Sequence, residues 1–136
     1  MNDDWRDMTQ VRRLLRSEIR LIWSIDRREY IDQIYRLADG RLHLEVDDFD
    51  VPGWPTGEAE TWRPLMEQCH DAGGWLHGVF DQQRLVAVAV LEGTFIGRER
   101  DRLQLKYLYT DQAWRGAGHA VGLFELACSE VLMRGA

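Results

Sequence analysis

Residues 114–122 read Trp-Arg-Gly-Ala-Gly-His-Ala-Val-Gly, and they follow residues 103–109, which have the pattern of a β-strand. Glycine costs about 1 kcal/mol relative to alanine inside a helix, so glycines at the start of a helical segment need a physical reason. One reason is a turn, because glycine adopts backbone conformations that other residues avoid. The other is a ligand that approaches the backbone so closely that side chains would obstruct it. Fold and function both depend on which reason applies.

The composition is that of one globular domain. The chain has 136 residues, of which 45% are hydrophobic and 29% are charged, and this is enough to bury a single core. We expect one domain over residues 1–136, in which residues 1–16 form either an ordered appendage or a frayed end. Cys69 and Cys128 have neither CxxC spacing nor a disulfide-rich context, so they are expected to be buried and reduced.

Charge and hydropathy argue against several kinds of partner. The net charge of −6 is unlike that of nucleic-acid-binding proteins, which usually carry a basic surface. The longest apolar run, residues 85–91, is much shorter than the roughly twenty residues of a membrane-spanning helix. The acidic N-terminus lacks the features of a secretion signal, so we expect a cytoplasmic protein. The histidines are scattered without metal-ligand spacing, and no metal is expected.

Hydrophobic periodicity predicts an α+β fold with a mostly antiparallel central sheet flanked by helices. Strands are expected at residues 19–25, 34–37, 42–46, 75–80, 84–91 and 103–109, and helices at residues 27–34, 61–72 and 116–134. The strand at 84–91 is apolar on both faces, which is typical of a central strand.

Three finer features accompany these elements. Asp39-Gly40 predicts a tight hairpin turn. Residues 47–57 are rich in acidic residues, proline and glycine, which predicts an irregular loop. The last helix is expected to bury one apolar stripe, formed by Ala120, Phe124, Ala127, Cys128 and Val131.

The start of this last helix suits an anion. The first four N–H groups of a helix have no partner within it, and the helix macrodipole places partial positive charge there. Residues 116–120 are mostly small and would let a phosphate come close, while Arg115 adds a positive charge. A dinucleotide fingerprint is not met, because the third small residue is missing where that pattern requires it, and no Gly-Lys-Ser/Thr of an NTP-binding loop occurs.

Residues 115–120 resemble the acetyl-CoA-binding signature of the GCN5-related N-acetyltransferase superfamily. That signature has glutamine or arginine first, glycine three residues later, and glycine or alanine two residues after that. Arg115, Gly118 and Ala120 meet all three positions, and Trp114 also fits the usual pattern. The resemblance covers residues 19–134. Members of this superfamily normally continue with a fifth strand, a helix carrying a tyrosine and a closing hairpin, so the sequence resembles the first two thirds of the fold, truncated after the motif helix.

The resemblance implies an enzyme that transfers the acetyl group of acetyl-CoA to a primary amine of a small molecule or peptide. It places the pyrophosphate on the backbone amides of Gly116, Ala117, Gly118, His119 and Ala120, with Arg115 at the mouth, and pairs the pantetheine arm with the backbone of Leu108, Tyr109 and Thr110. The alternative is a catalytically silent CoA-binding or protein-interaction module that retains the fold without the chemistry.

Side-chain chemistry is less specified than these backbone roles. A general base should lie near the end of a central strand, which makes Glu92 and Asp101 the catalytic candidates, each with the alternative of a solvated charge. His119 is a third candidate, for which a role at the helix start is the favoured interpretation. The superfamily's thiolate-protonating tyrosine would lie beyond residue 136, and Tyr107 and Tyr109 are expected to form core or the cofactor wall.

Two further features concern partners. An acidic group could attract a cationic amine or simply be solvated, and it consists of Glu45, Asp47, Asp48, Asp50, Glu58 and Glu60. Trp54, between two prolines, could form the wall of a site for a small apolar or aromatic ligand. The strand at 103–109 should leave an open sheet edge, to be covered by a second copy in a homodimer, by the N-terminal segment, or by residues of a longer parent chain.

Overall fold

The computed structural model describes residues 9–135, apart from the side chains of residues 29–36, 47–49 and 51. Its elements in chain order are β1 (Thr9–Arg13), the 3-10 helix η2 (Arg16–Ser24), β2 (Glu29–Ala38), β3 (Arg41–Val51), α1 (Glu58–Asp71), β4 (Trp75–Asp81), β5 (Arg84–Leu91), β6 (Leu105–Thr110), the short 3-10 helix η3 (Gln112–Trp114) and α2 (His119–Met133).

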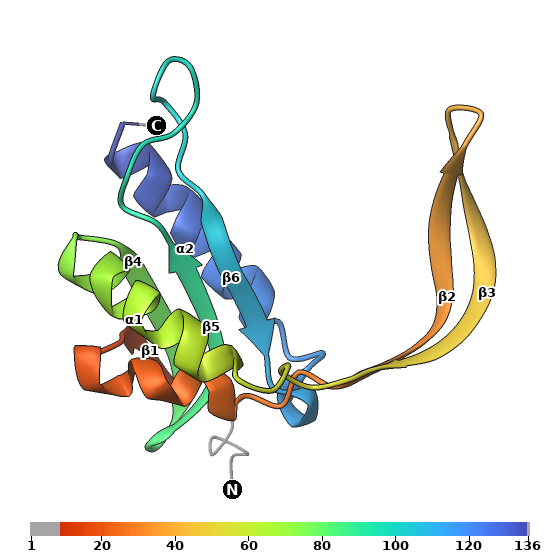
Figure 1. Ribbon diagram of the computed structural model, residues 1–136, viewed down its shortest axis with the longest axis horizontal. Coiled ribbons are helices and arrows are strands. Elements are labelled where there is room, and N and C mark those ends of the chain that lie inside the picture. Colours follow the sequence, from red (N-terminus) through yellow and green to blue (C-terminus); the bar gives the residue numbers. More distant parts are fainter. Residues whose placement is uncertain (1–8, 136) are drawn as a thin grey trace, which may run out of the picture.

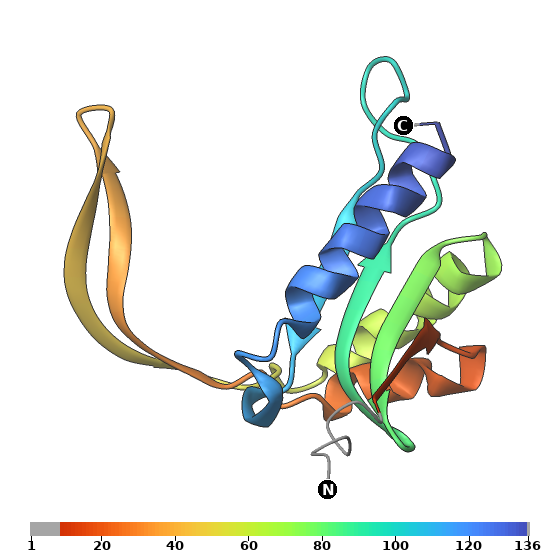
Figure 2. The same ribbon diagram turned by 180° about the vertical axis from the view of Figure 1, so that it is seen from behind.

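A four-stranded antiparallel sheet forms the body, in the order β1-β4-β5-β6. Helices α1 and η2 cover one face of this sheet, and α2 covers the other, as the two opposite views show (Figure 1, Figure 2). The α+β class with a mostly antiparallel sheet between helices is therefore confirmed. The predicted helix at 61–72 and the strands at 75–80, 84–91 and 103–109 are also confirmed, with small shifts of their ends.

The core lies on both faces of the sheet. On one face, Ile19 and Ile22 of η2 and Met66 of α1 pack against β4 and β5. On the other face, Leu123 and Ala127 of α2 pack against the same two strands. Every residue of β5 from 85 to 91 is buried, which confirms its central position. Removing this much apolar surface from water supplies the main drive for folding.

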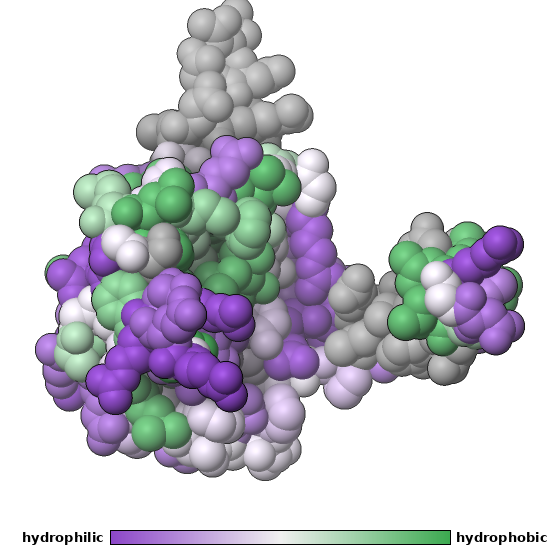
Figure 3. Space-filling model, turned by 90° about the horizontal axis from the view of Figure 1, so that it is seen from above, coloured by the Kyte–Doolittle hydropathy of each residue, from purple (hydrophilic) through white to green (hydrophobic). Residues whose placement is uncertain are grey.

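Strands β2 and β3 form a separate two-stranded sheet that projects as an arm away from the body (Figure 1). The tight turn at its tip is confirmed, because Asp39 and Gly40 have positive φ angles of 52° and 73°. Viewed from above, the tip of the arm stands apart from the body and carries hydrophobic and hydrophilic residues side by side (Figure 3). Leu37 and Leu42, which are paired across the arm, are 74% and 68% exposed.

The predicted strand at 19–25 is wrong, because this segment belongs to η2. Its apolar residues fit two periods. Ile19, Leu21, Trp23 and Ile25 alternate as in a strand, whereas Ile19, Ile22 and Ile25 recur every three residues, and the latter three are buried. A 3-10 helix has three residues per turn, so the second pattern places these side chains on one face.

Two neighbouring predictions also need correction. Residues 27–34 do not form a helix, because β2 begins at residue 29. The loop expected at 47–57 is shorter, because β3 continues through Val51. Cross-strand pairing extends the hairpin in both directions from its turn, with one register shift between Ile31 and Gln33. Pairing with the opposite strand therefore outweighs the local helical pattern of 27–34 and the loop composition of 47–51.

Helix α2 buries a stripe that is rotated relative to the predicted one. Leu123 and Ala127 are fully buried, whereas Phe124 is 48% exposed and Cys128 is also exposed. The expectation that Phe124 and Cys128 face the core is wrong. The face of α2 that lies against the sheet is formed by positions 120, 123, 127 and 131, which recur every three to four residues as one side of a helix does. Cys69 is only partly buried, so buried thiols are not found at either cysteine.

The N-terminal segment covers the far edge of the sheet. Residues Thr9–Arg13 form β1 and pair with β4, so the described part of residues 1–16 belongs to the domain; residues 1–8 lie outside the description. Within residues 9–135, the outer edge of β6 has no neighbouring strand. Over the same residues, no helix has the length and apolar character needed to cross a membrane.

Candidate functional site

A hollow of about 580 Å³ lies where the end of β6 meets the start of α2. It brings together nearly all of the backbone positions that the sequence motif singles out, although these come from a strand, a turn and a helix. The residues that line it are Arg27, Leu108, Tyr109, Thr110, Trp114, Arg115, Gly116, Gly118, His119, Ala120 and Val121. Of the expected cofactor-binding residues, Ala117 is the one that does not line the hollow.

The glycines of the turn have both a conformational and a spatial reason. Gly116 and Gly118 adopt φ angles of +85° and +83°, a region that favours glycine. A Cβ atom at either position would meet no protein atom within 4 Å. The turn thus requires glycine, and the space beside it is left open by the rest of the described chain.

The start of α2 faces this open space without a cap. Gly118 is the N-cap residue, and no side chain forms a capping hydrogen bond there. The first intrahelical hydrogen bond runs from the amide of Gly122 to the carbonyl of Gly118. The amides at the start of the helix that come before Gly122 therefore have no acceptor within the helix. Those amides and the macrodipole can therefore bind an anion in the hollow.

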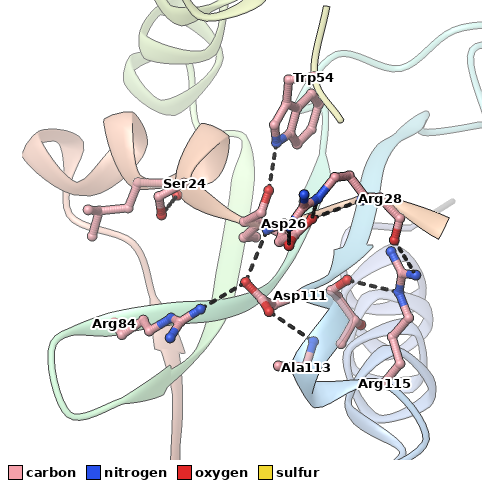
Figure 4. A network of polar contacts seen from close by, with 11 residues as sticks. Ser24, Asp26, Arg28, Trp54, Arg84, Asp111, Ala113 and Arg115 are labelled. Atoms are coloured by element: carbon pink, nitrogen blue, oxygen red, sulfur yellow. Dashed lines mark hydrogen bonds and ion pairs between the residues drawn. The ribbon is translucent and has the colours of Figure 1, made fainter. Parts of the chain in front are cut away.

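Asp111 holds the junction between β6 and α2 together (Figure 4). Its carboxylate accepts hydrogen bonds from the backbone N–H groups of Asp26 and Ala113, at 3.0 Å each, and from the Arg84 guanidinium at 3.1 Å. Only 1% of Asp111 is exposed. A buried carboxylate with these partners fixes the loop before the glycine turn, because leaving its donors unpaired would be costly.

Arg115 links the motif to a distant segment instead of reaching freely into the hollow. Its Nη1 donates to the carbonyl oxygen of Arg28 at 2.8 Å, and its Nε donates to that of Thr110 at 3.3 Å. Two of the five guanidinium N–H donors are thus used for backbone carbonyls, and the side chain still lines the hollow.

Aromatic side chains stand on the η2 side of β6. The Trp54 ring packs edge-on against Tyr109, with ring centroids 4.9 Å apart, and lies 6.0 Å from Tyr107. Its Nε1 donates to the carbonyl of Ile25 at 2.9 Å. Trp54 is thus fixed by a hydrogen bond and ring contacts, and the expectation that it forms a wall for a ligand stays a prediction.

Several polar atoms near the site are buried without a partner among the described residues. They are Trp23 Nε1, Tyr107 Oη and Thr110 Oγ1. Burial, with a smaller contribution from the negative charge of Glu58, raises the pKa of Tyr107 to about 12. Tyr107 is therefore a neutral phenol at physiological pH.

Neither carboxylate proposed as a general base lies in the hollow. Glu92 follows β5 on the α1 side of the sheet, where Lys106 Nζ lies 3.2 Å from its Oε1. Asp101 lies in the charged connection between β5 and β6, with 56% of its side chain exposed and Arg102 4.0 Å away. Their catalytic role stays a prediction that this placement does not favour.

The histidine and the acidic residues proposed from the sequence lie on different elements of the fold. His119 is the first residue of α2 and lines the hollow, with its ring 6.1 Å from that of Trp114. Glu58 and Glu60 lie in the first turn of α1, where negative charge suits the helix macrodipole. Glu45 and Asp50 lie on the arm, and the side chains of Asp47 and Asp48 are outside the description. None of the four described acidic side chains lines the hollow.

Sequence reasoning missed Arg27 and Asp111. Arg27 lies far from the motif in the chain and is brought to it by the fold. Asp111 could have been found, because an aspartate that follows a strand and precedes a turn often caps the next helical turn through its side chain. Here it does so through the hydrogen bond from the Ala113 amide.

No protein-family model matches the sequence, and no curated protein matches it significantly. Several solved structures resemble it, and two of them are acetyltransferases. Nourseothricin acetyltransferase superposes with a TM-score of 0.70 at 18% identity, over 95% of this chain and 69% of that protein. A protein from Bacillus anthracis str. Ames, assigned as a streptothricin acetyltransferase and solved in complex with acetyl coenzyme A, gives a TM-score of 0.57 at 13% identity, over 92% of this chain and 66% of that one.

The chain shares its fold with these two acetyltransferases. At these low identities the similarity establishes the architecture and not the activity. The chain spans about two thirds of the length of each of the two similar proteins. The hollow described above lies at the β6–α2 junction of this shared fold.

Proposed function

We propose that the chain binds acetyl-CoA in the hollow and transfers its acetyl group to a primary amine. The observation that carries this proposal is the uncapped start of α2, which opens onto a space that Gly116 and Gly118 leave free. A pyrophosphate placed there would receive hydrogen bonds from the main chain and favourable interaction with the macrodipole. The exposed outer edge of β6 would leave Leu108, Tyr109 and Thr110 accessible to an extended pantetheine arm.

In this reaction the amine nitrogen attacks the thioester carbonyl carbon, so that a C–N bond forms, the C–S bond breaks and CoA leaves as a thiolate. The nitrogen must lose a proton and the thiolate must gain one. His119 lies at the start of α2, where the pyrophosphate is proposed to bind, and the length of the pantetheine arm separates that position from the thioester. We therefore propose a water molecule as the proton acceptor, in preference to His119, Glu92 or Asp101.

A silent CoA-binding module is the second candidate. It is favoured by one observation, which is that Glu92 and Asp101 lie away from the hollow and that its described lining contains no carboxylate. Such a protein would bind the cofactor through the main chain without activating an amine.

Calorimetric titration with acetyl-CoA and a thiol-release assay would separate these functions. The amines should include a polyamine, free lysine, nourseothricin and streptothricin, the last two because the similar structures carry those names. Binding with amine-dependent thiol release supports the enzyme, and binding without release supports the silent module. The absence of heat and of thermal stabilisation at millimolar acetyl-CoA would contradict both.

A further inference from the structure

Arg27 lines the hollow from outside the glycine motif. It lies in the connection between η2 and β2, and its guanidinium carbon is 4.8 Å from the ring centroid of Trp54 and 5.3 Å from that of Tyr109. A guanidinium over aromatic faces is held by cation–π attraction. A cation–π contact occupies none of the guanidinium N–H donors with an oxygen acceptor, so these donors remain available for an anion.

The backbone on both sides of Arg27 is fastened to the β6–α2 junction (Figure 4). Before it, the Asp26 amide donates to Asp111 Oδ2 at 3.0 Å, and the Gln112 amide donates to the Asp26 carbonyl at 2.7 Å. After it, Arg115 Nη1 donates to the Arg28 carbonyl at 2.8 Å. These three hydrogen bonds fix where the Arg27 side chain leaves the main chain relative to the start of α2.

The nearby carboxylates are paired with other arginines. Asp26 forms an ion pair with Arg28 at 2.7 Å, and Asp111 forms one with Arg84 at 3.1 Å. Among the described side chains, no carboxylate lies within ion-pair distance of the Arg27 guanidinium. The positive charge of Arg27 is therefore directed at the hollow and its aromatic neighbours, without a compensating anion from the described chain.

We propose that Arg27 donates hydrogen bonds to a phosphate group of the bound CoA, opposite the amides that begin α2. This inference rests on the proposed CoA site and adds a residue to it. The aromatic rings of Trp54 and Tyr109 hold the guanidinium in place, and the Asp111 clamp positions the segment that carries it. The phosphate is either the pyrophosphate or the 3′-phosphate of CoA, which share the same chemistry toward an arginine.

The test compares the wild-type protein with Arg27→Gln and Arg27→Lys in calorimetric titrations with CoA and with dephospho-CoA, which lacks the 3′-phosphate. Arg41→Gln is the matched control, because Arg41 is exposed next to the turn at the tip of the arm and its substitution removes the same charge. Unfolding midpoints are measured for all four proteins. Arg27→Gln should weaken CoA binding by about tenfold or more and reduce its dependence on salt. Arg27→Lys should recover part of the loss, and Arg41→Gln should bind like the wild type.

Each outcome has a distinct meaning. A loss with both ligands assigns Arg27 to the pyrophosphate, and a loss with CoA alone assigns it to the 3′-phosphate. Equal affinity of Arg27→Gln and wild type for both ligands overturns the inference, even if Arg27→Gln unfolds more easily, because Arg27 would then only cover the aromatic rings. If the wild type itself binds neither ligand, the proposed function fails instead.

Discussion

At the scale of single residues, Gly118 is where backbone conformation and access to the hollow coincide. We predict that Gly118→Asp weakens CoA binding by about tenfold more than Gly118→Asn does. Both side chains strain a residue at φ +83°, which asparagine and aspartate tolerate better than most, and they have nearly the same size. Only aspartate adds negative charge beside the proposed phosphate site.

Calorimetric dissociation constants would test this prediction, with unfolding midpoints as a check that both variants fold. Equal constants for Gly118→Asp and Gly118→Asn would mean that no anion sits at the start of α2. Loss of folding in both variants would shift the comparison to Gly116, whose φ angle and surroundings are similar.

Asp111 should matter for stability more than its partner Arg84. We predict that Asp111→Asn lowers the free energy of unfolding by about 2–4 kcal/mol, because the buried acceptor of three hydrogen bonds loses its charge. Arg84→Gln should cost less than about 1 kcal/mol, since the Arg84 side chain is 59% exposed. Urea unfolding of the two variants measures both values, and a cost of Arg84→Gln as large as that of Asp111→Asn would show that the ion pair dominates.

The raised pKa of Tyr107 leads us to predict that the free energy of unfolding falls in alkaline solution. The unfolded state loses the phenolic proton near pH 10, whereas burial keeps it on the folded protein up to a pKa of about 12. Stability should therefore be fully present below about pH 10 and decline between about pH 10 and 12 as the unfolded state is favoured. Tyr107→Phe should lessen this decline and leave stability near pH 8 equal or higher, because the hydroxyl is buried without a partner among the described residues. Thermal midpoints at pH 8 and pH 11 provide the comparison, and an identical alkaline decline in both proteins would contradict it.

At this scale, the sequence predicted which backbone positions line the candidate site, but it did not predict which charged side chains do. Gly116, Gly118 and Ala120 could be placed because a local signature at the end of a strand specifies main-chain geometry. Arg27 is held beside the hollow because its neighbours Asp26 and Arg28 form hydrogen bonds to residues more than eighty positions away, and no local pattern encodes such contacts. Glu92 looked suitable from its position in the chain, but the face of the sheet on which it lies depends on tertiary packing.

At the scale of elements, the arm and the body should respond differently to the loss of apolar side chains. Leu37→Ser and Leu44→Ser should change the free energy of unfolding by less than about 0.5 kcal/mol, because these leucines are 74% and 54% exposed on the arm. Leu76→Ala should cost about 2–5 kcal/mol, because Leu76 is fully buried in β4. Urea unfolding curves test this contrast, and a large cost at Leu37 or Leu44 would mean that something covers that face in solution.

The elements that were predicted wrongly are those whose conformation is decided by contacts with other parts of the chain. Residues 19–25 satisfy both a period of two and a period of three, and only burial of Ile19, Ile22 and Ile25 against the sheet selects the second. Residues 29–38 extend as β2 because the Asp39-Gly40 turn positions β3 to pair along their whole length. In contrast, residues 84–91 admit one interpretation, since a run that is apolar on both faces fits a central strand.

At the scale of the whole molecule, the proposed site depends on segments that are far apart in sequence and meet at one end of the sheet. The end of β6, the start of α2 and the connection after η2 are joined there by Asp111 and Arg115 (Figure 4). The arm leaves from the same connection, but among residues 9–135 its two strands pair with each other alone (Figure 1). Anything that moves the base of the arm would therefore act on the segment that carries Arg27.

This arrangement predicts two separable stabilities within one chain. Native-state hydrogen exchange should show that the amides of β2 and β3 open with a lower free energy than those of β5, because a lone two-stranded sheet is marginal in water whereas β5 is buried between two layers. Added acetyl-CoA should slow exchange at the first amides of α2 and at residues 26–28, while the tip of the arm near Gly40 serves as an internal reference that does not change. Exchange measured by NMR at several urea concentrations gives the opening free energies. If β2, β3 and β5 open together in one transition, the arm is part of the cooperative body. If acetyl-CoA binds but protects the start of α2 without residues 26–28, the clamp does not couple the Arg27 segment to the ligand.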